Sequence, residues 1–169
     1  MTLSLGHRLV LLPSLARRRT WQQLHDHLRA DVRRAAGRDP QPSAAILDSQ
    51  SVRTVERGGL ERGFDCGKLI KGRKRHLLVD TLGLMHGLVV HSGGVQGRAG
   101  GPLLLEQCRG PTAPPQVLLK WRWIVERTIG WLNLARPLIK DYVFLPASNQ
   151  AFIRLTMISI MLARLAQQA

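Results

Sequence analysis

The chain has 169 residues and 44% of them are hydrophobic, which is enough for one compact domain with a core and excludes a chain disordered by composition. Its 25 Lys and Arg against 11 Asp and Glu give a formal net charge of +14, a balance unlike that of an ordinary enzyme of small metabolites. A positive field of this size favours a polyanionic partner, either DNA, RNA or anionic lipid, and the alternative is a solvated basic surface without a dedicated partner.

Compartment is indicated by the cysteines and by the two most apolar stretches. Cys66 and Cys108 have no metal-ligand or disulfide spacing, so free thiols in a reducing compartment are expected. The early stretch RLVLLPSLA lacks a basic start and a cleavage pattern, so it does not predict a signal peptide. The late stretch FIRLTMISIMLARLA contains two arginines and predicts a core helix, not a membrane span. We therefore expect a cytoplasmic protein with no membrane partner.

The first periodic segment follows residues 1–19, which show no clear period. Thr20 is a suitable N-cap, Gly37 is a natural stop, and the residues between them predict a helix. Its apolar face is predicted from residues three or four apart: Trp21, Leu24, Leu28, Val32 and Ala35. The opposite face carries Arg29, Arg33 and Arg34, either as a solvated surface or as a contact for a phosphate backbone.

A small sheet is predicted next. The sequence AAILD, at 44–48, is typical of a short buried strand, and the glycine-rich, charged residues 51–75 predict a long loop or an irregular hairpin. Residues 76–81 and 84–91 are rich in branched apolar side chains, and Leu82-Gly83 between them predicts a tight turn. Together these segments give at least three strands.

Helices are predicted for the remainder. The glycines of 93–101 indicate a loop, 102–108 a helical turn or two, and GPTAPP at 110–115 a linker. From Gln116 the apolar spacing becomes helical and continues to Pro137, and a last helix begins near Ser148. The order of helix, strand, hairpin and two helices predicts an α/β fold with a small sheet.

The most basic stretch, KLIKGRKRH at 68–76, holds five Lys or Arg and no acid. Like charges in a strand or turn repel, so the run contributes little to a fold, whereas phosphates beside it would release counterions. It predicts nucleic-acid contact, and a plain solvated loop is the alternative. The candidate side chains are Lys68, Lys71, Arg73, Lys74 and Arg75.

Two acids stand out because of their apolar surroundings. Asp48 ends the predicted strand 44–48, and Glu126 lies within the helical sequence WRWIVERTIGWLN. Taken singly, Asp48 suits a turn, and Glu126 suits an ion pair with Arg122 or Arg127. Taken together, two carboxylates on a strand end and a later helix could hold Mg²⁺ for phosphoryl transfer on nucleic acid.

Four phrases carry a resemblance to a known family: AAILDSQSVRT, ERGFDCGKLIKGRKRHLLVDTLGL, HSGGVQGRAGGPLLLEQ and the sequence from WIVERTIGWLN to the C-terminal helix. They resemble bacterial insertion-sequence transposases of the DDE type, in the subgroup with a DSQSV start and a VERT-x-x-WL helix. The resemblance implies a ribonuclease-H-like fold in which two aspartates and a glutamate surround Mg²⁺ while DNA ends are cut and joined.

Carried onto this sequence, the resemblance makes Asp48 the first aspartate and Glu126 the glutamate, both catalytic and metal-binding. Arg122 matches the arginine four residues before that glutamate and joins the DNA-binding set. Asn133 stands where the family often has a lysine. The resemblance divides the chain into an unmatched leader (1–19), an N-terminal helix with a linker (20–43) and a ribonuclease-H-like domain (44–169), with a small mixed sheet and flanking helices.

The middle aspartate of the family has no counterpart, because residues 102–120 contain Glu106 as their sole acid. The spacing there predicts an incomplete fold that lacks a central strand and helix. We therefore expect a transposase whose metal-dependent cleavage and joining of DNA is impaired, and whether it remains an enzyme is left open. The alternatives are a non-catalytic basic DNA-binding remnant and a translated remnant with no role. A homo-oligomer or a mixed complex with full-length transposase is the expected assembly.

Overall fold

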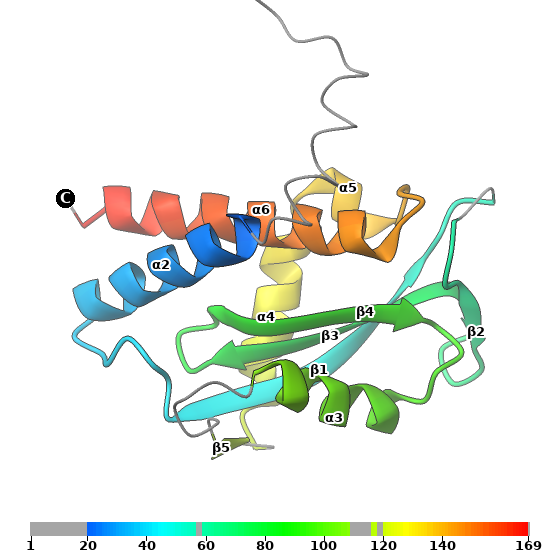
Figure 1. The fold of residues 1–169 in the computed structure, drawn as a ribbon, viewed down its shortest axis with the longest axis horizontal. Helices are drawn as coiled ribbons and strands as arrows, with labels where there is room; N and C mark the ends of the chain where they lie inside the picture. Colours follow the sequence, from blue (N-terminus) through cyan, green and yellow to red (C-terminus); the bar gives the residue numbers. More distant parts are fainter. Residues whose placement is uncertain (1–19, 57–58, 109–115, 118–119, 169) are drawn as a thin grey trace, which may run out of the picture.

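The computed structural model describes residues 20–56, 59–108, 116–117 and 120–168 (Figure 1). In chain order, the elements are α2 (Thr20–Ala35), β1 (Ala44–Arg53), β2 (Gly63–Asp65), β3 (Ile70–Asp80), β4 (Met85–Ser92), α3 (Gly97–Gln107), β5 (Gln116–Val117), α4 (Arg122–Asn133), α5 (Arg136–Ile139) and α6 (Pro146–Ala166). Among the described helices, none is both long and apolar enough to cross a membrane.

The sheet is mixed and is built around the long strand β3. On one side β3 pairs antiparallel with β1, and on the other side it pairs antiparallel with β4 and, near its start, with β2. The short strand β5 pairs parallel with the first residues of β1, at Ala44 and Ala45. The expected α/β fold with a small mixed sheet and flanking helices is confirmed.

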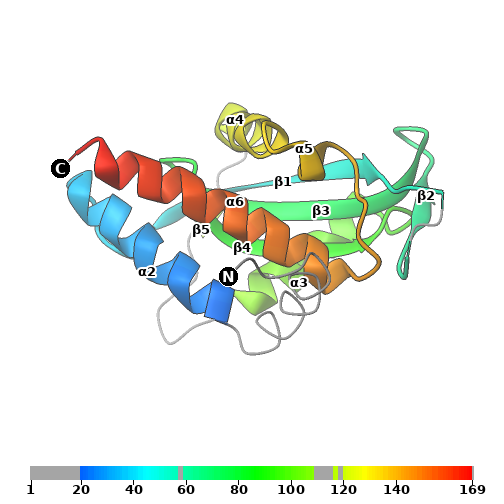
Figure 2. The same ribbon diagram turned by 90° about the horizontal axis from the view of Figure 1, so that it is seen from above.

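Helices cover both faces of the sheet. Helices α2 and α6 lie side by side over one face and run in the same direction, and α3 lies against the other face (Figures 1 and 2). Helix α4 is seen nearly end-on in Figure 2, where it lies beside β1. It is thus near the edge of the sheet that is farther from β4.

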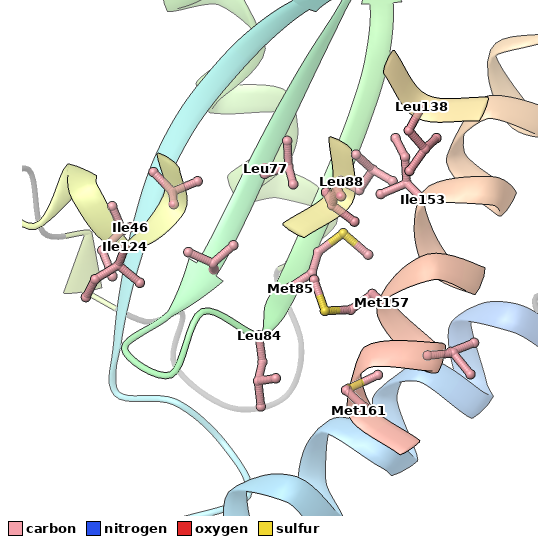
Figure 3. Packing of buried hydrophobic residues seen from close by; sticks show 14 of the residues in the cluster. Ile46, Leu77, Leu84, Met85, Leu88, Ile124, Leu138, Ile153, Met157 and Met161 are labelled. Carbon is pink, nitrogen blue, oxygen red and sulfur yellow. The ribbon is translucent and has the colours of Figure 1, made fainter. Parts of the chain in front are cut away.

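The main core lies between the sheet and the layer formed by α2, α4, α5 and α6. Figure 3 shows Ile46, Leu77 and Leu88 of the sheet directed toward Ile124 of α4 and Met157 of α6. A second, smaller cluster beneath α3 contains Ala45, Leu78, Val89 and Leu104. Because consecutive strand residues point to opposite faces, the alternation of these two sets along β1 and β3 fixes which side chains face α4.

The structure corrects three expectations about the elements. Of the two predictions for residues 51–75, the irregular hairpin is confirmed by the antiparallel pairing of β2 with β3, and the long loop is wrong because β1 continues to Arg53 and β3 begins at Ile70. The glycine-rich segment expected to be loop forms the start of α3 at Gly97. Gln116 begins the strand β5 and not a helix, and α4 begins at Arg122. The expected linker at 110–115 and the leader at 1–19 lie outside the described residues.

Helix α2 has the predicted extent but a different buried face. Gly37 follows it with a φ of +67°, the left-handed conformation that suits a helix C-terminus. Its buried residues are His25, Arg29, Val32 and Arg33, so the predicted basic surface is wrong for Arg29 and Arg33. Arg33 is drawn inward because its guanidinium pairs with the fully buried carboxylate of Asp80.

Candidate nucleic-acid interface and carboxylate site

Asp48 lies in the middle of β1, on the strand face that is turned toward α4. It shares this face with Ile46, which packs in the core with Ile124 of α4. Arg122, at the start of α4, donates a hydrogen bond from Nη2 to Oδ1 of Asp48 over 3.2 Å. The Asp48 side chain is 18% exposed and that of Arg122 is 59% exposed, so the pair lies at the surface of the β1–α4 junction.

Glu126 lies on the side of α4 that faces β1. With 3.6 residues per turn, Arg122, Glu126 and Asn133 fall within an arc of about 40°. Arg122 contacts Asp48, and Asn133 accepts a hydrogen bond at Oδ1 from Nε2 of Gln50 over 3.2 Å. Glu126 stands between these two contacts along the helix, and it is exposed. The strand and the helix that carry the two predicted carboxylates are therefore neighbours.

A third carboxylate is not supplied between β5 and α4. Strand β5 runs parallel to β1, and the sequence after it reads LLKW before α4 begins. Within the described part of the chain, no three His, Cys, Asp or Glu side chains are grouped so as to hold a metal ion. Asp48 is in addition paired with Arg122. These residues do not fit a three-carboxylate metal centre.

The predicted DNA-binding stretch is mostly inside the protein. Arg73 is 0% exposed in the middle of the sheet. Its guanidinium donates to Oδ2 of Asp141 over 2.9 Å and to the backbone carbonyls of Leu60, Val143 and Phe144. Arg73 therefore ties the loop after β1 and the segment before α6 to the sheet.

Its neighbours Lys74 and Arg75 are buried on opposite faces of β3. Lys74 forms an ion pair of 3.1 Å with Asp65 and donates to the carbonyl of Val95. Hydrogen bonds from Ser51 and Lys74 lower the pKa of Asp65 to about 2. Arg75 donates to Oδ1 of Asn149 on α6 over 3.0 Å, and burial lowers its pKa to about 10. Such partners make these cations part of the fold.

The exposed cations of the predicted set are Lys68, Lys71 and Arg122. Lys68 reaches over β1, where its Nζ donates to the backbone carbonyl of Ser49 over 3.2 Å. Lys68 and Arg122 thus contact adjacent residues of β1 and flank Asp48 with positive charge. This surface of β1, β3 and α4 is the part of the predicted set that is open to a phosphate backbone.

A histidine pair beneath α3 was not singled out in the sequence. The rings of His76 and His91 are stacked with their centroids 4.7 Å apart, on neighbouring strands. His76 is fully buried, and its burial, together with the nearby His91 and Lys74, lowers its pKa to about 4. The predicted tight turn at Leu82-Gly83 was the signal that could have placed the two rings together, because it pairs the strands that carry them.

Comparison with known proteins adds a family to this geometry. Residues 39–115 match the family described as Transposase DDE domain, and that segment therefore carries a transposase DDE domain. The match extends over less than half of the 169 residues, and no curated protein and no solved structure matched the chain.

The matched segment includes Asp48 and the basic stretch and ends before β5 and α4, which carry no part of the match. The mixed sheet with flanking helices is consistent with a ribonuclease-H-like DDE domain. A domain of this family implies DNA transposition, DNA as a partner and a divalent metal as a cofactor.

Proposed function

We propose that this chain is a transposase-derived DNA-binding protein of the DSQSV and VERT-x-x-WL subgroup, in which metal-dependent cleavage and joining of DNA is impaired. The observation that supports the proposal is the small number of carboxylates at the β1–α4 junction. There Asp48 and Glu126 stand on adjacent elements, flanked by Arg122, while the sequence from 107 to 125 contains no Asp or Glu.

The physical reason for the impairment is the number of carboxylates. In-line displacement at a phosphate is favoured when cations stabilise both the attacking and the leaving oxygen. Two carboxylates, one already neutralised by an arginine, hold a divalent cation more weakly than three. DNA binding needs none of this, because Lys68, Lys71 and Arg122 act through charge alone.

The test of catalysis uses purified full chain with DNA ending in the terminal repeats of the element, in Mg²⁺ or Mn²⁺. We expect no end cleavage or strand transfer above the level of Asp48→Asn. Robust turnover that Asp48→Asn abolishes would defeat the claim of impairment.

The test of binding uses the same DNA without metal, at increasing salt. We expect affinity to fall steeply with salt, and Lys68→Gln and Lys71→Gln each to reduce the slope of log K against log salt by about 1. Absence of binding at low salt would contradict a DNA-binding role. A chain that gains thermal stability with Mn²⁺, and loses that gain in Asp48→Ala, would favour a working metal site over a non-catalytic remnant.

The proposed assembly is a homo-oligomer or a mixed complex with full-length transposase. Co-purification of a tagged full-length transposase with this chain, in the presence of terminal-repeat DNA, tests the mixed complex. Sedimentation of the chain alone tests the homo-oligomer.

A further inference from the structure

Two tryptophans and two arginines form a continuous stack on the outside of α4. The Arg127 guanidinium lies 5.1 Å from the Trp123 ring centroid and 4.7 Å from that of Trp131. Arg164, which comes from α6, lies 4.6 Å from the Trp131 ring. Residues four apart on a helix are neighbours on one face, so Trp123, Arg127 and Trp131 form one row along α4. We call these four residues the Trp–Arg ladder.

The ladder is anchored at one end and open at the other. Trp131 and Arg164 are partly buried where α4 meets α6, whereas Arg127 is exposed and Trp123 is 57% exposed. More than half of the Trp123 surface is open to solvent, so a planar ligand can reach its ring. The guanidinium stacked on it restricts the ring, which lowers the entropy lost when a planar ligand stacks against it.

The open end lies beside the carboxylate site. Trp123 precedes Glu126 by three residues, a spacing that puts their Cβ atoms about 5–6 Å apart on adjoining parts of the helix surface. Arg122, the residue directly before Trp123, pairs with Asp48. A nucleotide whose phosphate lies at Arg122 can therefore place its base near the Trp123 ring.

We propose that Trp123, the open end of the Trp–Arg ladder, is a stacking site for an unpaired base of single-stranded DNA whose backbone lies at the β1–α4 junction. The proposal rests on the proposed function, since it assigns the form of DNA that the same site prefers. Aromatic rings alternating with cations are the groups that hold single strands, the rings through the faces of the bases and the arginines through stacking and charge. Bases inside a duplex are stacked on one another and cannot present a face to Trp123.

The charge of the surface favours nucleic acid over a protein partner. The chain carries a net charge of +14, and two of the four ladder residues are cations. A second copy of the chain would bring the same positive charge against this face, which is unfavourable. A polyanion gains counterion release at the same place.

The experiment measures binding of a fluorescent single strand and of the matching duplex to the full chain, in EDTA. Trp123→Ala should weaken single-strand binding about tenfold, a loss typical of one stacked base, and leave duplex binding within about twofold. Trp123→Phe should retain most of the affinity. The matched control is Tyr142→Ala, which removes another aromatic side chain of similar exposure, 60%, outside the ladder. Melting temperatures of all variants verify that each is folded.

The outcomes separate this proposal from the proposed function. An unchanged single-strand affinity in Trp123→Ala, with duplex binding intact in every variant, overturns the ladder alone. Equal losses for single strand and duplex also overturn it. A loss that coincides with a change in oligomeric state by sedimentation assigns the ladder to a protein interface instead. No binding of either form of DNA by the wild type defeats both proposals, and the cleavage assay has no bearing on this result because no metal is present.

Discussion

Replacing Arg73 by methionine removes the guanidinium of a buried ion pair while keeping an unbranched side chain. The Asp141 carboxylate, itself 1% exposed, would lose its ion-pair partner. The carbonyls of Leu60, Val143 and Phe144 would lose a donor. Removing one member of a buried ion pair costs about 3–5 kcal/mol, because the other charge stays in a medium of low polarity. Since domains are stable by about 5–15 kcal/mol, Arg73→Met should lose a large part of the total.

Urea unfolding followed by tryptophan fluorescence measures this loss. The control is Lys71→Met, two residues earlier on β3 and exposed, which should change the free energy of unfolding by less than about 0.5 kcal/mol. Adding Asp141→Asn to Arg73→Met should restore part of the stability, because the unpaired charge is then gone.

The DNA affinities of the same variants complete the test. Lys71→Met should bind DNA more weakly with its stability unchanged, and Arg73→Met should lose stability first. If Arg73→Met is within about 1 kcal/mol of the wild type and binds DNA as weakly as Lys71→Met, the buried position of Arg73 is wrong.

Three further predictions concern the pH dependence of stability and two glycines. The folded pKa of His76, about 4, is below its ordinary value of 6.5, so the stability it contributes is present above pH 6.5 and is lost as the pH falls toward 4. The loss is up to about 3 kcal/mol and should be smaller in His76→Leu when unfolding is measured across this range. A Cβ on Gly72 would lie 1.9 Å from the Val52 carbonyl oxygen, so Gly72→Ala should lower the free energy of unfolding by about 1–3 kcal/mol. Gly130→Ala, in the open on α4, should raise it by about 0.5–1 kcal/mol.

Local signals in the sequence predicted most elements of the fold. The stop at Gly37 and the turn at Gly83, with φ of +67° and +78°, depend on a conformation that glycine adopts readily, so each was visible from one residue and its flanks. The β3–β4 hairpin and the final helix were predicted from their apolar patterns, and the structure confirms both. Gln116 was placed in a helix because two strand residues are too few to show a period.

The basic stretch shows what local signals lack. A run of lysines and arginines predicts a surface because burial of a cation requires a partner, and the partner of Arg73 is 68 residues away. Asn149 is 74 residues from Arg75. No pattern within the run distinguishes Lys71, which is exposed, from Arg73, which is buried. The same limit applies to the Trp–Arg ladder, because its row on α4 follows from spacing but Arg164 joins it only through the packing of α6.

The backbone hydrogen bonds of β1 bear on the cause of the proposed loss of DNA cleavage. The carbonyls of Ser43 and Arg53 accept hydrogen bonds from Gln116 and Asp141, on the side away from β3. The backbone groups of an antiparallel strand alternate in direction. The N–H and C=O groups of the odd-numbered positions of β1 therefore point away from β3, and those of the even-numbered positions, including Asp48, bond to β3. The Asp48 carboxylate is thus carried by backbone that is fixed within the sheet, which is the support that a functional group requires. If cleavage is weak, the cause we infer is the number of carboxylates at the β1–α4 junction and not the placement of the one on β1.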